Sequence, residues 1–261
     1  GSRNYEEVKM KYRIYDILII LVLIFGIINT FMNIRKQEYN EVVEVVAEPM
    51  EENTIKEPEV QPQKEIASNI NDWNLILVNK DNPIPDNYKP EVTIVEENFK
   101  VDTRIKDAAL QMLTDARNQG LSPVICSAYR EPDYQKMLFN KKVKEYKRQG
   151  YSQSRAEEQA ALWVTIPGTS EHEIGLSLDI VSKEYQILDE KQESTDVQKW
   201  LMEHCYEYGF ILRYPTNKKD ITKINYEPWH YRYVGVENAM FMKEKGFCLE
   251  EYIEYLKSFE N

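Results

Sequence analysis

His172, Asp179 and His230 are the residues of this chain whose types and spacing could do chemistry. They fall in the segments Ser-Glu-His-Glu-Ile-Gly-Leu-Ser-Leu-Asp179 and Glu-Pro-Trp-His230, which hold two of the chain's three histidines. Two imidazoles and one carboxylate can hold a catalytic zinc ion, which keeps a fourth position open for water. Glu227 stands just before His230 in the second segment, close enough to accept a proton from that water. The pattern indicates a hydrolase with one zinc ion per chain.

A histidine taken singly is more often a structural residue than a metal ligand, so only the combination carries the zinc hypothesis. His204, the remaining histidine, illustrates the alternative, because it lies in a helical pattern of apolar residues where we expect packing or partial exposure. A catalytically silent zinc domain stays open as a different class of protein. Glu227 argues against it, since a structural zinc site has no need of a base beside the metal.

Two strands are expected to carry the ligands. His172 and Asp179 cannot share a helical face, because their separation and the intervening Gly175 favour a turn that leads into a strand over 176–182. The alternation of large and polar residues predicts a second strand over 229–234. Neighbouring strands would bring the distant ligands together.

Four segments of the chain resemble one known family. The stretch from Pro167 to Ile180 resembles the Ser-x-His-x-x-Gly-x-Ala-x-Asp motif of the VanY-type D-alanyl-D-alanine carboxypeptidases, zinc peptidases that act on bacterial cell-wall peptides. Glu-Pro-Trp-His230 resembles the second motif of that family. Ser-Ala-Tyr-Arg130 with the later Gln135, and the segment 75–86, resemble two further elements. The four motifs occur in the family's order.

The resemblance implies a role for each matching residue. His172, Asp179 and His230 would be the zinc ligands, and Glu227 the general base. Arg130 would be the cation that meets the substrate, because a guanidinium can hold a carboxylate through two hydrogen bonds. The pocket would be lined by Arg130 and by Ser127, Tyr129, Gln135 and Ser170.

The resemblance also implies a reaction. It is the release of the C-terminal D-alanine from peptidoglycan pentapeptide stems or their lipid-linked precursors, a D,D-carboxypeptidase activity that fits vancomycin resistance as well as ordinary wall remodelling. An L,D-carboxypeptidase acting on tetrapeptide stems is the alternative. Ser177 departs from the family motif, which usually has Ala there. Its hydroxyl could bond the backbone or a ligand, and bears on substrate preference more than on the type of reaction.

The N-terminal region is predicted to be a membrane anchor. From Ile14 to Met32 the chain is apolar except for one charge near the start, and this stretch is long enough to cross a hydrocarbon core of about 30 Å. A cleaved signal peptide is the nearest alternative, but no small-x-small cleavage site follows. We predict a cytoplasmic N-terminus at 1–13, a single-pass anchor at 14–34, an acidic linker with prolines at 35–71, and an extracytoplasmic carboxypeptidase domain at 72–261.

The carboxypeptidase domain is expected to have an α+β fold. The resemblance implies a small central antiparallel sheet flanked by helices. Apolar periodicity, caps and turn residues predict helices at 102–118, 133–148, 152–164 and 195–209, the last opened by a capping box at Thr195 and Gln198, and strands at 123–127, 176–182, 210–214 and 229–234.

Charge and cysteine content narrow the partners. The formal net charge is -11 at pH 7, which argues against nucleic acid, because phosphate binding needs clustered Lys and Arg. The three cysteines share no metal-finger spacing. Cys126 follows Pro-Val-Ile in a predicted strand and is expected to be a buried small hydrophobe. We expect a monomer.

Overall fold

The structure, a computed structural model, describes residues 68–259 of the 261-residue chain. The predicted anchor at 14–34 and most of the predicted linker at 35–71 lie outside these residues. Within 68–259, no helix is both long enough and apolar enough to cross a membrane.

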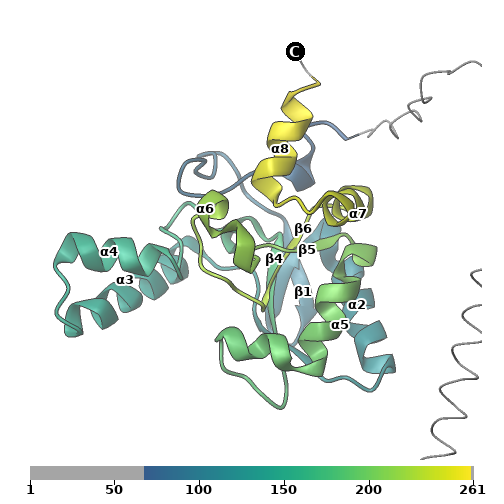
Figure 1. The fold of residues 1–261 in the computed structure, drawn as a ribbon, viewed down its shortest axis with the longest axis horizontal. Helices are drawn as coiled ribbons and strands as arrows, with labels where there is room; N and C mark the ends of the chain where they lie inside the picture. Colours follow the sequence, from purple (N-terminus) through teal and green to yellow (C-terminus); the bar gives the residue numbers. More distant parts are fainter. Residues whose placement is uncertain (1–67, 260–261) are drawn as a thin grey trace, which may run out of the picture. The chain divides into compact units, whose positions relative to one another are not determined.

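A four-stranded sheet lies at the centre of the described domain (Figure 1). Its strand order is β3 (Pro123–Ser127), β4 (Ser177–Ser182), β6 (His230–Tyr233) and β5 (Phe210–Leu212). All three neighbouring pairs are antiparallel. Every residue of β4 is buried, as expected for a central strand covered on both faces. The predicted α+β class and the small antiparallel sheet are confirmed.

One face of this sheet packs against two helices, α2 (Lys106–Asn118) and α5 (Asp196–His204). α2 buries Ala109, Met112, Leu113 and Ala116, whose spacing of three and four residues forms one apolar stripe. Ala109, Met112 and Leu113 of this stripe meet apolar side chains of β3, β4 and α5 in the main hydrophobic core. The opposite side of β4 is therefore left to carry polar side chains.

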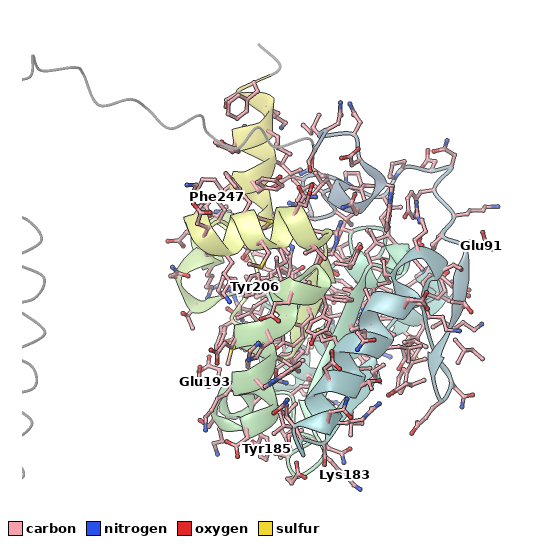
Figure 2. All side chains as sticks on the ribbon, turned by 90° about the vertical axis from the view of Figure 1, so that its right-hand side faces the viewer. Glu91, Lys183, Tyr185, Glu193, Tyr206 and Phe247 are labelled. Carbon is pink, nitrogen blue, oxygen red and sulfur yellow. The ribbon has the colours of Figure 1, made fainter. Side chains whose placement is uncertain are left out.

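A second hydrophobic cluster joins β5 to the C-terminal helices α7 (Val236–Lys245) and α8 (Leu249–Lys257). Tyr206 and Phe247 pack against this cluster, and Figure 2 shows both near α7. The N-terminal 3₁₀ helix η1 (Trp73–Leu75) also belongs to it through the buried Leu75. The two ends of the described chain thus pack behind the sheet edge formed by β5.

The helices α3 (Pro132–Arg148) and α4 (Gln153–Ala161) form a hairpin that extends away from the sheet (Figure 1). We call this hairpin the arm. Its own small core consists of Val143, Ala156 and Ala160, with Phe139 and Tyr146 packed against them. The internal packing of the arm therefore comes mainly from its own residues and not from the main core.

The remaining elements of residues 68–259 are short. A hairpin of β1 (Val92–Glu96) and β2 (Phe99–Asp102) forms a separate two-stranded sheet. The others are α6 (Lys219–Thr222) and five 3₁₀ turns, η2 (Thr103–Ile105), η3 (Glu171–Ile174), η4 (Glu190–Ser194), η5 (Cys205–Tyr208) and η6 (Thr216–Lys218).

Most predicted elements are present, with differences at their ends. The helix predicted over 102–118 opens with η2 before α2 begins, and the helix predicted to reach 164 ends at Ala161. The predicted capping box is only half formed. Thr195 Oγ1 accepts from Gln198 N at 3.2 Å, but Gln198 Oε1 accepts from Tyr231 OH at 2.6 Å instead of the side chain turning back to the cap.

Cys126 is exposed, so the prediction that it is buried was wrong. The pairing of β3 with β4 shifts register between Ile125 and Ser127. A bulge of this kind inserts an extra residue and breaks the alternation of inward and outward side chains on which the prediction depended. All three cysteines are free thiols.

Candidate active site

Strand pairing brings two of the predicted ligands together. Asp179 of β4 and His230 of β6 are opposite residues of the antiparallel pair, and opposite side chains of such a pair lie on the same face of the sheet. His172 comes from η3, whose N-cap Ser170 accepts from His172 N through Oγ at 3.3 Å. We call His172, Asp179 and His230 the ligand triad.

Gly175 makes the turn from His172 into β4. It has a left-handed conformation with φ of 73°, and its carbonyl oxygen accepts from Asp102 N at 2.9 Å. A Cβ atom at this position would lie only 2.9 Å from Asp102 N. Glycine is thus needed both for the backbone conformation and for the close approach of β2.

The ligand triad has the geometry of a metal site. His172 Nε2 lies 3.2 Å from Asp179 Oδ2, and His230 Nδ1 lies 3.0 Å from Asp179 Oδ1. One ligand atom from each residue lies within 4.8 Å of the others, and all three side chains are buried. Two imidazole nitrogens and a carboxylate oxygen suit zinc with an open position. The residues present therefore fit a zinc ion.

Two of the three triad residues, His172 and Asp179, have the protonation state that a metal ion needs. Burial and the positive charge of Arg130 lower the pKa of His172 to about 4, so this ligand is neutral at neutral pH. Burial opposes ionisation of Asp179, but the two histidines hold its pKa well below the usual range. Burial alone would lower the pKa of His230, yet hydrogen bonds with Asp179 and Glu171 raise it to about 9. A metal ion must displace that proton.

Glu227 places a second carboxyl group beside the triad. It is buried, and its Oε2 lies 3.8 Å from His230 Nδ1. Its backbone NH donates to Tyr214 O at 3.2 Å, which fixes the turn before β6. Burial raises the pKa of Glu227 to about 8, and a cation in the triad would lower it again. The carboxyl group is near enough to exchange a proton with a molecule held at the triad.

Arg130 contacts the triad directly. Its Nη2 donates to Asp179 Oδ2 at 2.8 Å. Two other residues predicted for the pocket hold the guanidinium, because Nε donates to Ser127 Oγ at 2.9 Å and Nη1 donates to Gln135 Oε1 at 3.2 Å. The backbone NH of Arg130 donates to His172 O at 3.1 Å. A permanent positive charge is thus fixed at the edge of the site.

A cavity of about 340 Å³ opens onto the triad. Its lining contains the triad, Glu227, Arg130, Ser127 and Ser170. The lining does not contain Tyr129, whose OH donates to Glu131 Oε2 at 3.2 Å, or Gln135, which is fully buried behind Arg130. His204 lies apart on α5, partly exposed, with Nδ1 2.9 Å from Glu207 Oε1, as the sequence predicted.

The arm supplies a second wall of the cavity that the sequence analysis did not identify. Tyr134, Leu138 and Lys141 of α3 line it, at the spacing of one helical face. A helix was predicted there, but the apolar pattern of an isolated helix does not say which exposed face borders a site. Trp229 and the exposed Cys126 also belong to the lining.

Glu171 is a second residue that the sequence analysis missed. Its side chain is fully buried, and Oε2 lies 3.3 Å from His230 Nε2. Oε1 accepts from Arg213 Nε at 2.7 Å and from Arg232 Nη1 at 2.9 Å. The one available signal was its place next to His172, which does not reveal that it contacts the other histidine.

Ser177, the departure from the family motif, is fully buried in β4. Its Oγ has no hydrogen-bond partner among the described residues. Neither of the two bonds that the sequence allowed, to the backbone or to a ligand residue, is formed within the described residues.

Comparison with known proteins agrees with this geometry. Residues 98–236 match the family described as VanY, D-alanyl-D-alanine carboxypeptidase. The chain belongs to this family. The resemblance drawn from the four sequence motifs is confirmed.

Relatives and solved structures extend the match. The chain is 40% identical over 208 residues to a D-alanyl-D-alanine carboxypeptidase of Enterococcus faecalis, covering 80% of this chain and 74% of the relative. It is 41% identical, with a TM-score of 0.64, to a VanY D,D-pentapeptidase variant from a VanB-type resistance cassette solved with Zn(II), covering 69% of this chain and 99% of the other. It is 37% identical, with a TM-score of 0.60, to the LdcB LD-carboxypeptidase, covering 68% and 84%.

The family and the triad agree on the class of protein. This VanY-family chain is a zinc-dependent carboxypeptidase, and the three ligands in its described domain can hold the ion. The predictions of an enzyme and of a zinc cofactor are confirmed.

Proposed function

We propose that this chain releases the C-terminal D-alanine from peptidoglycan pentapeptide stems or their lipid-linked precursors. The observation that carries the proposal is the position of the Glu227 carboxyl group beside a complete buried ligand triad. A domain that only bound cell-wall peptides would not need this carboxyl group, whose burial is unfavourable. The similarity to a D,D-pentapeptidase supports the choice of substrate.

The site residues divide the work of peptide hydrolysis. His172, Asp179 and His230 would hold the zinc ion, which when bound supplies acidification of a water molecule and polarisation of a peptide carbonyl. Glu227 takes up the water proton and returns it to the departing amine. It is buried, so bulk water competes little for that proton.

Arg130 holds the substrate by its free carboxylate. Its guanidinium has five donors, and the contacts with Asp179, Ser127 and Gln135 use three different nitrogens. Its side chain keeps 14% exposure toward the cavity. A short chain with a terminal carboxylate therefore finds a charged partner beside the triad, and an amidated terminus loses it.

The similarity to the LdcB LD-carboxypeptidase supports cleavage of tetrapeptide stems as a second candidate. The full chain should be incubated with pentapeptide, tetrapeptide and free D-Ala-D-Ala, and the products identified by mass spectrometry. We expect dominant release of D-alanine from the pentapeptide, lost on chelation and restored by zinc. Release from the tetrapeptide alone would establish the L,D activity, and cleavage of no peptide would leave a binding domain.

The membrane location is also part of the proposal. The apolar segment 14–34 would tether an extracytoplasmic monomeric domain near lipid-linked substrate, where tethering raises effective concentration. The full chain should fractionate with membranes, and a chain that lacks residues 1–67 should not, while both cleave soluble pentapeptide at the same rate. Equal fractionation of the two chains would reject the anchor.

A further inference from the structure

The two ring nitrogens of His230 face two different carboxylates. Nδ1 lies 3.0 Å from Asp179 Oδ1, and Nε2 lies 3.3 Å from Glu171 Oε2. Nδ1 is the nitrogen on the side of the triad, so it is the atom that would bind the metal. A nitrogen that binds a metal offers a lone pair, and the ring hydrogen must then sit on the other nitrogen.

Glu171 is fixed in a form that only accepts hydrogen bonds. Two guanidinium groups, those of Arg213 and Arg232, donate to its Oε1 at 2.7 and 2.9 Å. Next to two permanent positive charges the carboxyl group stays ionised, and an ionised carboxyl group has no hydrogen to give. Its contact with His230 therefore requires the ring hydrogen on Nε2.

The carboxylate is also held in place from both ends of the domain. Arg213 donates to Glu250 of α8 through Nη1 at 2.8 Å and Nη2 at 2.7 Å. Arg232 Nη2 donates to the carbonyl oxygens of Asn74 at 3.0 Å and Ile76 at 2.8 Å. Both guanidinium groups are fully buried. Glu171 thus has a defined orientation before any metal arrives.

We propose that Glu171 is a positioning residue that fixes His230 with its hydrogen on Nε2, so that Nδ1 presents its lone pair to zinc. The inference rests on the proposed zinc site. His172 has an analogous arrangement with an uncharged acceptor, since its Nδ1 lies 2.8 Å from the carbonyl oxygen of Ala128. A substitution cannot remove that carbonyl, but it can change Glu171. His230 is therefore the ligand whose orientation can be tested.

Glu171→Gln should move the ring hydrogen of His230 from Nε2 to Nδ1. A glutamine amide has one accepting oxygen and one donating nitrogen. The two guanidinium donors at the Oε1 position retain the oxygen, so the amide nitrogen faces His230 Nε2. That nitrogen then has to accept, and the ring hydrogen moves to Nδ1, where it blocks the metal. Zinc affinity should fall about 10- to 100-fold.

Glu250→Gln is the matched control. It is the same substitution in the same buried network, but Glu250 contacts Arg213 and not His230 among the described residues. Zinc affinity of the full chain, measured by competition with a chromophoric chelator, should fall for Glu171→Gln and stay within about 3-fold for Glu250→Gln. Both variants should unfold at lower temperature in the zinc-free form. Equal losses of affinity would overturn the proposal, because they would follow from network damage alone.

The unaltered chain gives an independent test that does not depend on folding of a variant. The sequence has three histidines, so long-range proton–nitrogen NMR spectra contain three imidazole patterns, with the partly exposed His204 as an internal reference. The zinc-loaded chain should show His230 with hydrogen on Nε2 and metal on Nδ1. The opposite pattern would overturn the role of Glu171 while leaving the zinc peptidase intact. A chain that binds no zinc would reject the proposed function and this inference with it.

Discussion

The catalytic cavity has two walls that are built in different ways. The wall formed by η3, β4 and β6, which we call the ligand wall, carries residues with 2–4% exposure, His172 at 3%, Asp179 at 2% and His230 at 4%. The wall formed by α3 carries Tyr134, with 50% exposure, and the exposed Lys141. The triad residues that would hold the zinc ion are buried, whereas the side chains of α3 that can contact the body of the substrate are exposed to solvent.

The difference in packing explains this division. Each triad residue has at least one polar partner from another element, so its position follows from the whole sheet. The arm is stabilised by a small core of its own. Substitutions in the ligand wall should therefore change metal binding and turnover, and substitutions in the arm should change the apparent affinity for substrate.

The largest effect expected separates ligand from base within the ligand wall. His172→Ala should lose zinc and turnover together, because the triad then offers only two ligands. Glu227→Ala should keep zinc and lose about 10²- to 10⁴-fold in kcat, the usual range for proton transfer. Metal content by mass spectrometry and steady-state kinetics on pentapeptide check both variants. If Glu227→Ala released zinc, Glu227 would have to be reassigned from general base to metal ligand.

The ligand wall was largely predictable from sequence. The strands that carry Asp179 and His230 could be predicted because alternation and turn residues determine strands locally, whereas the pairing that sets the two residues opposite each other is seen in the structure. Glu171 could not be predicted, since its contact with His230 depends on how η3 packs against β6, and no local pattern encodes that. The prediction that Cys126 is buried was wrong for a related reason, because the bulge in β3 depends on the pairing of two distant strands.

The helices and strands were also predictable only where a local pattern determines them. α2 was predicted because its apolar spacing indicates a buried face, and the end of α3 was predicted because Gly150 follows it. The C-terminal helices α7 and α8 and the β1–β2 hairpin were not identified. The helix predicted to reach 164 ends at Ala161, and the next residue makes a long-range contact that no local pattern encodes, because Asn225 N of the loop after α6 donates to Leu162 O at 3.0 Å.

The second prediction concerns Arg130, which lies at the junction of the two walls. Arg130→Ala should lower kcat/KM for a peptide with a free carboxylate about 10- to 100-fold, because a charge-assisted hydrogen bond is lost. It should also abolish the preference over the amidated peptide. Arg155→Ala on α4, whose partner Glu158 is exposed, is the control and should change neither value. A retained preference in Arg130→Ala would assign carboxylate binding to another group.

A smaller effect should distinguish the arm from the ligand wall. Lys141→Ala should raise KM about 2- to 5-fold with kcat unchanged, because one exposed charge beside an anionic substrate contributes little. Lys144→Ala is the matched control, an exposed lysine of the same helix that does not belong to the cavity lining. If both variants raised KM equally, the arm would act only through its overall charge. A fall in kcat for Lys141→Ala alone would contradict the division between the walls.

The smallest effect is expected at Ser177, where the ligand wall buries a hydroxyl group without a hydrogen-bond partner among the described residues. Among the described residues, the buried side-chain atoms without a hydrogen-bond partner are Tyr88 OH and Ser177 Oγ. Burying an unpaired hydroxyl is unfavourable, so Ser177→Ala should raise the free energy of unfolding by about 1 kcal/mol and leave turnover unchanged. Ser127→Ala is the contrast, because its Oγ accepts from Arg130 Nε at 2.9 Å and its loss should reduce kcat/KM. Thermal unfolding and kinetics of both variants decide the point. A less stable Ser177→Ala would show that the hydroxyl has a partner after all, and that the ligand wall contains no unpaired group.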